Sequence, residues 1–234
     1  MILRVIHVCW ADGVVDRSSI ALRRCFGPDA TVVEELYRFL IRGRVRTKDE
    51  PQVMFMFSDL TTAPPENVYT MNCVWPFDFS RYSELAQIDS EPIRGQRKRM
   101  ILDALQEGLL WMSSQLGWEQ QPFVDAHAAA LERNLVLQAT LKKSWVSPNK
   151  RFRAYVHFVL DSNGVVFEAV LHRNRTKQEV ARKHLCTVEA YLGCVREYAG
   201  EVKWSNTTTF SMTTTSAHFT RQHWEVDFRE EMQQ

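Results

Sequence analysis

Hydroxyl, imidazole and carboxylate side chains, the groups of a nucleophilic triad, are concentrated near the end of the chain. The stretch 207–228 contains seven threonines, two serines and two histidines. One interpretation is a threonine or serine nucleophile activated by His218 or His223, with Asp227 orienting the imidazole. However, the chain has no GxSxG turn to display such a nucleophile. Polar and apolar residues alternate over 223–228, so we expect a terminal strand with one polar face.

Metal and cofactor chemistry has little support in the residue spacings. The seven histidines form no HExxH, HxH or HxxxH pattern, and the five cysteines form no CxxC pair. A zinc site needs four ligands, or three ligands and a water molecule. The glycine-rich patterns of nucleotide-binding loops, GxGxxG and GxxxxGKS or GxxxxGKT, are absent as well. We therefore expect no metal and no cofactor.

A basic and aromatic segment is the leading candidate for a binding surface. Between Arg133 and Arg175 the chain has eight lysines and arginines against two acids. Arginine, tyrosine and tryptophan are favoured anchors in protein interfaces, and such residues also stack bases and neutralise phosphates. A solvated face, or one covered by a helix of the first half, is the alternative. The candidate partner-binding residues are Trp145, Lys150, Arg151, Arg153, Tyr155, His157, His172 and Arg173.

Two alternating segments predict a β-hairpin over 151–172, which carries most of these residues. Apolar residues recur at every second position in both arms, around the turn dipeptide Asn163-Gly164. A two-residue turn there places Tyr155 opposite His172. A four-residue loop ending at Gly164 would bury the same faces, because the shift in pairing is even.

A helix is predicted directly after the hairpin. Thr176 and Glu179 have the spacing of a capping box, and apolar residues then recur at helical spacing. The pattern predicts a helix over 176–199 that ends at Gly200. We expect this helix to cover an antiparallel sheet formed by the hairpin 151–172 and the terminal strands.

The first half predicts a mixed α/β arrangement. Asp29 is a plausible N-cap for a helix, and basic residues crowd the first turns of a longer helix, where they oppose the helix dipole. The predicted strands cover 3–10, 52–57 and 67–75, and the predicted helices cover 30–42, 92–117 and 122–134. The fold class is therefore α+β, with a mixed half over 1–118 and a β-rich half over 119–234. The two halves could equally form one continuous domain.

Composition limits the compartment and the partners. The chain has 234 residues, with 29 basic and 28 acidic side chains and a net charge of +1. This balance does not favour nucleic acid or an anionic membrane. No apolar run approaches the ~18 residues of a membrane helix, and the N-terminus lacks the pattern of a signal peptide. The five widely spaced cysteines are typical of a reducing compartment, so we expect a cytoplasmic protein.

These observations favour a non-enzymatic protein that binds and occludes a protein partner, for example a bacterial immunity protein that inhibits a cognate toxin. One alternative is a hydrolase or transferase whose site is assembled from scattered histidines: His157, His172, His218 and His223. A second alternative is an RNA-associated module. Nucleic acid ranks last because the chain has neither a basic balance nor an RNP-type motif. The identity of the partner and the oligomeric state do not follow from the sequence.

Overall fold

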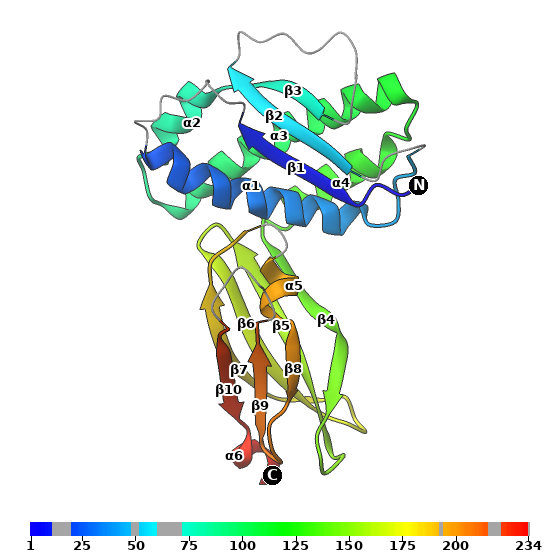
Figure 1. The fold of residues 1–234 in the computed structure, drawn as a ribbon, viewed down its shortest axis with the longest axis vertical. Coiled ribbons are helices and arrows are strands. Elements are labelled where there is room, and N and C mark those ends of the chain that lie inside the picture. Colours follow the sequence, from blue (N-terminus) through cyan, green and yellow to red (C-terminus); the bar gives the residue numbers. More distant parts are fainter. Residues whose placement is uncertain (11–19, 48–51, 60–71, 192–193, 215–220, 234) are drawn as a thin grey trace. The chain divides into compact units, whose positions relative to one another are not determined.

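The first part of the chain contains both helices and strands, and strands dominate the second part (Figure 1). The structure, a computed structural model, describes residues 1–10, 20–47, 52–59, 72–191, 194–214 and 221–233. Contacts divide the chain into two compact units, Met1–Leu137 (unit 1) and Gln138–Gln234 (unit 2). Unit 1 contains a parallel sheet and unit 2 contains antiparallel sheets. The predicted α+β class is therefore confirmed.

Unit 1 is built on a three-stranded parallel sheet with the strand order β1-β2-β3. Its strands are β1 (Val5–Trp10), β2 (Gln52–Asp59) and β3 (Asn72–Phe77). Side chains alternate between the two faces of a strand, and the register aligns the apolar rows of all three strands on one face. That face is buried and contains Ile6, Val8, Val53, Phe55, Phe57, Cys73, Trp75 and Phe77.

The described part of unit 1 also contains the helices α1 (Ile20–Ile41), α2 (Phe79–Ala86), α3 (Glu91–Leu116) and α4 (Gln121–Glu132). The predicted long helix is present as α3, and its apolar residues at helical spacing are buried. Gly108 of α3 lies against the ring of Phe55, which a Cβ atom at that position would overlap. This glycine therefore lets α3 approach the sheet closely. Because α4 contacts α1 and α3, it lies in unit 1, whereas the sequence-based division at residue 118 placed it in the second half.

Asp29 does not have its predicted role. It lies inside α1, which begins at Ile20 and continues through Pro28. Aspartate is a preferred N-cap residue, so the local pattern was misleading. The Asp29 carboxylate is fully buried and accepts hydrogen bonds from Tyr82 Oη at 2.6 Å and from Arg97 Nε at 2.8 Å. Its partners come from other helices rather than from the first turn of its own.

Two side chains of α1 bond to backbone groups in and directly before β1. Glu34 accepts a hydrogen bond from the backbone N–H of Val8, and Arg38 Nε donates to the carbonyl of Arg4 at 3.1 Å. An uncovered strand edge leaves backbone groups unpaired, and burying such groups without partners is costly. Glu34 is only 4% exposed, and burial raises its pKa to about 8. Its carboxyl group is therefore largely protonated at neutral pH.

Unit 2 consists mainly of two sheets. The four-stranded sheet has the order β4-β5-β6-β7, and the three-stranded sheet has the order β10-β9-β8. The first contains β4 (Leu137–Val146), β5 (Phe152–Asp161), β6 (Gly164–Arg173) and β7 (Glu179–Val188). The second contains β8 (Glu201–Trp204), β9 (Thr209–Thr213) and β10 (His223–Asp227). Two short helices, α5 (Cys194–Tyr198) and α6 (Arg229–Gln233), accompany them.

The predicted hairpin is present as β5 and β6, with the predicted faces. Every second residue of β5 is buried. The two-residue turn at Asn163-Gly164 is wrong, because Asp161 pairs with Gly164 and Tyr155 pairs with Val170. This register is the one that the four-residue loop implies. The apolar rows still share one face because the two registers differ by two residues.

The predicted helix over 176–199 is wrong. Residues 179–188 form β7, which pairs antiparallel with β6, and only the short helix α5 follows. Val180, His184 and Val188 recur at intervals of four, which fits a helix but also fits one side of a strand. Pairing with β6, which extends from Glu179 to Val188 with two register shifts, satisfies many backbone groups of the segment and favours the strand. Thr176 serves the turn instead, accepting a hydrogen bond from the N–H of Gln178 at 3.4 Å.

The three-stranded sheet packs against the apolar face of the four-stranded sheet. The rings of Trp145 and Phe210 lie 5.7 Å apart, and Trp204 Nε1 donates to the carbonyl of Trp145 at 3.1 Å. Tyr198 of α5 adds an edge contact to Phe167, with centroids 6.4 Å apart. A second sheet with a short helix thus covers this face, in place of the long helix that the sequence predicted.

Candidate functional site

The four-stranded sheet has a second face, which we call the outer face. It lies opposite the apolar row of β5, and alternation assigns the odd-numbered residues of β5 to it. Most of its side chains are half-exposed or exposed. The outer face contains Thr140, Ser144, Arg153, Tyr155, His157, Val159, Val166, Glu168, Val170, His172, Glu179, Arg182 and His184.

A polar row crosses the outer face. The register places His157 opposite Glu168, and Glu168 opposite His184. Nδ1 of His157 lies 3.2 Å from Oγ1 of Thr140. Burial, and then the nearby Arg182 guanidinium, hold the pKa of His157 below its usual value. His157 is therefore largely neutral at pH 7 and bonds to the threonine hydroxyl.

The acids of the outer face are paired with an arginine of the same face. Arg182 Nη1 donates to Glu168 at 2.9 Å, and Arg182 Nη2 donates to Glu179 at 3.2 Å. The hydrogen bonds that Arg182 donates to Glu179 and Glu168 raise the pKa of its guanidinium. Counted together with Arg153, the two arginines of the outer face balance its two glutamates.

A second group lies at one end of the outer face. The Tyr155 and His172 rings are 4.9 Å apart, although the two residues are not directly opposite. Arg153 Nη1 donates to Ser144 Oγ at 2.7 Å, and Arg153 Nε donates to Asn174 Oδ1 at 3.2 Å. The structure thus brings together four of the predicted residues, Arg153, Tyr155, His157 and His172.

Two turns at this end form what we call the basic turns, residues 147–151 and 173–178. Asn174 joins them, because its N–H donates to the carbonyl of Arg151 at 2.9 Å and its Nδ2 donates to that of Lys150 at 3.0 Å. The two segments contain five cations and no acid: Lys150, Arg151, Arg173, Arg175 and Lys177. Three of these cations belong to the predicted set.

Trp145 does not lie on the outer face. Its ring is on the other face of the four-stranded sheet, where it packs against Phe210 of the three-stranded sheet. The structure therefore does not bring it to the outer face with the other predicted residues. Sequence reasoning also missed Glu168, Arg182 and His184, mostly because β7 was predicted as a helix. Residues 179–186, EVARKHLC, do not alternate strictly, and the pairing of β7 with β6 has two register shifts, so the local pattern gave no clear signal for a strand.

The histidine of the terminal strand has hydroxyl and carboxylate partners, as a triad would. His223 Nδ1 lies 2.7 Å from Thr213 Oγ1, and its Nε2 lies 2.9 Å from Glu225 Oε1. Asp227, the predicted orienting acid, accepts from the backbone N–H of Arg229 instead. Thr213 is only 4% exposed, so its hydroxyl is poorly placed to attack a substrate carbonyl. His218 lies outside the described residues.

Cys73 and Cys186 are buried free thiols. Burial raises the pKa of Cys73 to about 11 and that of Cys186 to about 12, so both remain thiols rather than nucleophilic thiolates at neutral pH. Within the described residues, no three His, Cys, Asp or Glu side chains are grouped so as to hold a metal ion. Nor does any helix in the described ranges have the length and apolarity to cross a membrane.

The molecule is thus an α+β protein with a parallel α/β unit and a two-sheet unit whose outer face is polar and, at one end, strongly basic. No family model matches the chain, and neither the curated proteins nor the solved structures include a match to it.

Proposed function

We propose that this protein is a non-enzymatic binding protein, and that it docks an acidic protein partner through the outer face and the basic turns. The basic turns carry the proposal. Five cations lie in two turns that Asn174 holds together, and neither turn contains an acid. Complementarity favours a partner that presents carboxylates at this end of the sheet.

The neighbouring outer face supplies suitable contact area. Tyr155 is half-exposed beside His172, and aromatic rings of this kind are common anchors in interfaces. Arg153 is already oriented by its bonds to Ser144 and Asn174, so less side-chain freedom is lost when a partner binds. A rigid strand scaffold thus presents side chains whose positions are largely set before contact.

Occlusion is the mechanism that this surface supports. An antiparallel sheet face can cover an acidic cleft and exclude its substrate without any chemistry of its own. An inhibitor or immunity-type protein that neutralises a cognate toxin would act in this way, in the cytoplasm, where free cysteines are stable. The net charge of +1 argues against a nucleic-acid function, in which a domain-wide basic balance is usual.

The proposal is tested by affinity capture with the full-length chain, followed by calorimetry with the purified partner. The test variant is Lys150→Glu combined with Arg151→Glu, and the control is Arg196→Glu, an exposed cation of α5 in the same unit. We expect the double variant to weaken binding by about tenfold or more, because like charges across an interface cost several kcal/mol. The control should bind as the wild type does.

Two results would overturn the proposal. Equal affinity of the wild type and the double variant would remove the basic turns from the interface. A captured species that absorbs at 260 nm, and whose binding weakens steeply between about 50 and 200 mM salt, would indicate nucleic acid instead.

A further inference from the structure

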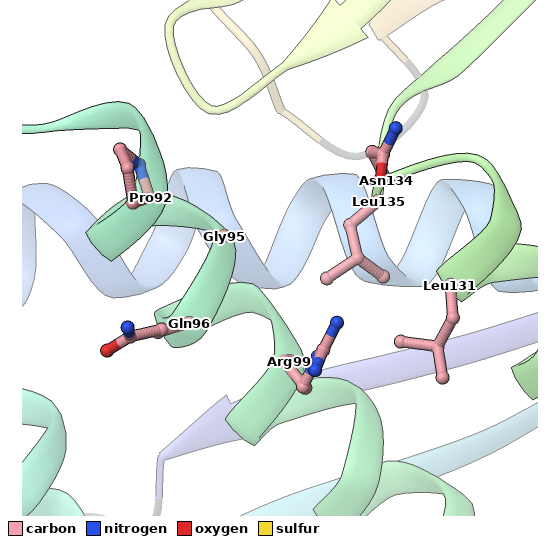
Figure 2. Close-up of a pocket in the computed structure, with 7 residues that line it drawn as sticks. All are labelled: Pro92, Gly95, Gln96, Arg99, Leu131, Asn134 and Leu135. Atoms are coloured by element: carbon pink, nitrogen blue, oxygen red, sulfur yellow. The ribbon is translucent and has the colours of Figure 1, made fainter.

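An open surface cavity of about 220 Å³ lies in unit 1, between the start of α3 and the end of α4 (Figure 2). Its polar side chains, those of Gln96, Arg99 and Asn134, are exposed. Its lining residues are Pro92, Gly95, Gln96, Arg99, Leu131, Asn134 and Leu135. The walls thus combine apolar carbon with two amides and one guanidinium. Because a water molecule occupies about 30 Å³ in the liquid, the space is equivalent to roughly seven water molecules and suits a small molecule.

Arg99 is the charged group of this cavity. It is one of four cations near the start of α3, and the other three each bind an oxygen atom of a described residue: Arg94 that of Asp89, Arg97 that of Asp29, and Lys98 that of Leu135. Within the part of the chain that the structure describes, Arg99 has no such partner. Figure 2 shows its guanidinium on the side of α3 that faces Leu131 and Leu135.

Gly95 also lines the cavity. It lies one turn before Arg99, on the same side of α3. A Cβ atom at Gly95 would meet no atom within 4 Å. Packing therefore does not require this glycine, in contrast to Gly108. A glycine inside a helix costs roughly 0.5–1 kcal/mol relative to alanine, and its effect here is to keep the cavity open.

We propose that this cavity binds a small molecule carrying a carboxylate or phosphate group. Arg99 pairs with the oxyanion, since guanidinium and oxyanion geometries match in a two-bond contact. The amides of Gln96 and Asn134 offer further hydrogen bonds, and Leu131 and Leu135 contact the apolar part of the ligand. This site is in unit 1 and does not depend on the function proposed for the outer face.

The test uses phenyl phosphate as the probe and backbone amide chemical shifts of the full-length chain as the readout. We expect saturable shifts at Gly95, Gln96 and Asn134. Arg99→Gln should weaken the apparent affinity by about tenfold or more, because it removes the charge-assisted bonds. Arg42→Gln, an exposed arginine of the same unit that does not line the cavity, should leave the affinity unchanged.

A second variant separates loss of the site from loss of the fold. Gly95→Leu places a side chain in the cavity and favours the helix, so it should abolish the shifts while the melting temperature stays at or above that of the wild type. Benzoate and inorganic phosphate, titrated separately, distinguish a carboxylate from a phosphate ligand.

Three outcomes would overturn the proposal. They are the absence of saturable shifts with all three anions, equal binding by the Arg99→Gln variant, and equal binding of benzyl alcohol, which has no charge. Each would show that the cavity does not recognise an oxyanion, whatever the result for the outer face.

Discussion

Arg97 Nε lies 2.8 Å from Asp29 Oδ2 in the interior of unit 1, and the two side chains are 4% and 0% exposed. Tyr82 Oη donates to the same carboxylate oxygen at 2.6 Å. The carboxylate therefore links three helices, because Asp29 belongs to α1, Tyr82 to α2 and Arg97 to α3. A buried charge is tolerated only when it is paired and hydrogen-bonded. Removal of one partner should therefore lower the stability of unit 1.

Arg97→Met should strongly destabilise the protein. It leaves the Asp29 carboxylate buried without a cation, a change that typically costs about 3–5 kcal/mol. The free energy of unfolding from urea denaturation at neutral pH measures this loss. The matched control is Arg94→Met, whose partner Asp89 is 88% exposed, so its loss should stay below about 1 kcal/mol. Similar losses in the two variants would contradict a special role for the buried pair.

Glu34→Gln should change how stability depends on pH. Burial raises the folded-state pKa of Glu34 from 4.5 to about 8, so the folded chain keeps a proton that the unfolded chain releases between these values. The stability that this proton provides is complete below the unfolded pKa and is lost as the pH rises toward the folded pKa, by on the order of 1 kcal/mol per pH unit. Glutamine keeps an acceptor for the Val8 N–H but does not titrate.

The free energies of unfolding of the wild type and Glu34→Gln should therefore be similar near pH 4 and diverge toward about pH 8, with the variant the more stable. Urea denaturation at several pH values provides the measurement. Parallel curves for the two proteins would show that Glu34 does not titrate with a raised pKa.

Gly108→Ala and Gly95→Ala should have opposite effects on stability, although both lie in α3. A Cβ atom at Gly108 would overlap the Phe55 ring, whereas at Gly95 it would meet no atom within 4 Å. Overpacking typically costs about 1–3 kcal/mol, and replacing a helical glycine in open space stabilises by up to about 1 kcal/mol. Thermal melting of both variants tests this, and a loss of stability in Gly95→Ala would indicate that its surroundings are filled.

Trp145→Ala should lower stability rather than act only on partner binding. The indole packs against Phe210, and the backbone carbonyl of Trp145 accepts from Trp204. Removing a partly buried tryptophan from between two sheets should cost about 2 kcal/mol or more. Tyr155→Ala, a half-exposed ring of the outer face, is the comparison and should cost less. A Trp145→Ala variant as stable as the wild type would place the ring outside the packing between the sheets.

Local patterns in the sequence determined the elements whose own residues specify one structure. Alternation over 152–160 identified the buried face of β5, because a strand with one wet face has a strict period of two. The apolar spacing in α3 identified that helix, since its stripe packs against the rest of unit 1. The basic and aromatic character of residues 150–173 was likewise evident before their arrangement was known.

Tertiary structure alone decided the remaining features, because in each case the deciding partner is distant in sequence. The segment 179–188 fits both helical and strand spacing, and its pairing with β6 selects the strand. The sequence around Asp29 predicts a helix cap, but in the structure Asp29 lies inside α1 and pairs with Arg97 of α3. The same holds for the outer face, whose His157, Glu168 and His184 are brought into one row by strand register. Hydrogen-bond pairing and burial act between residues far apart in the chain, and local propensity yields to them where the two disagree.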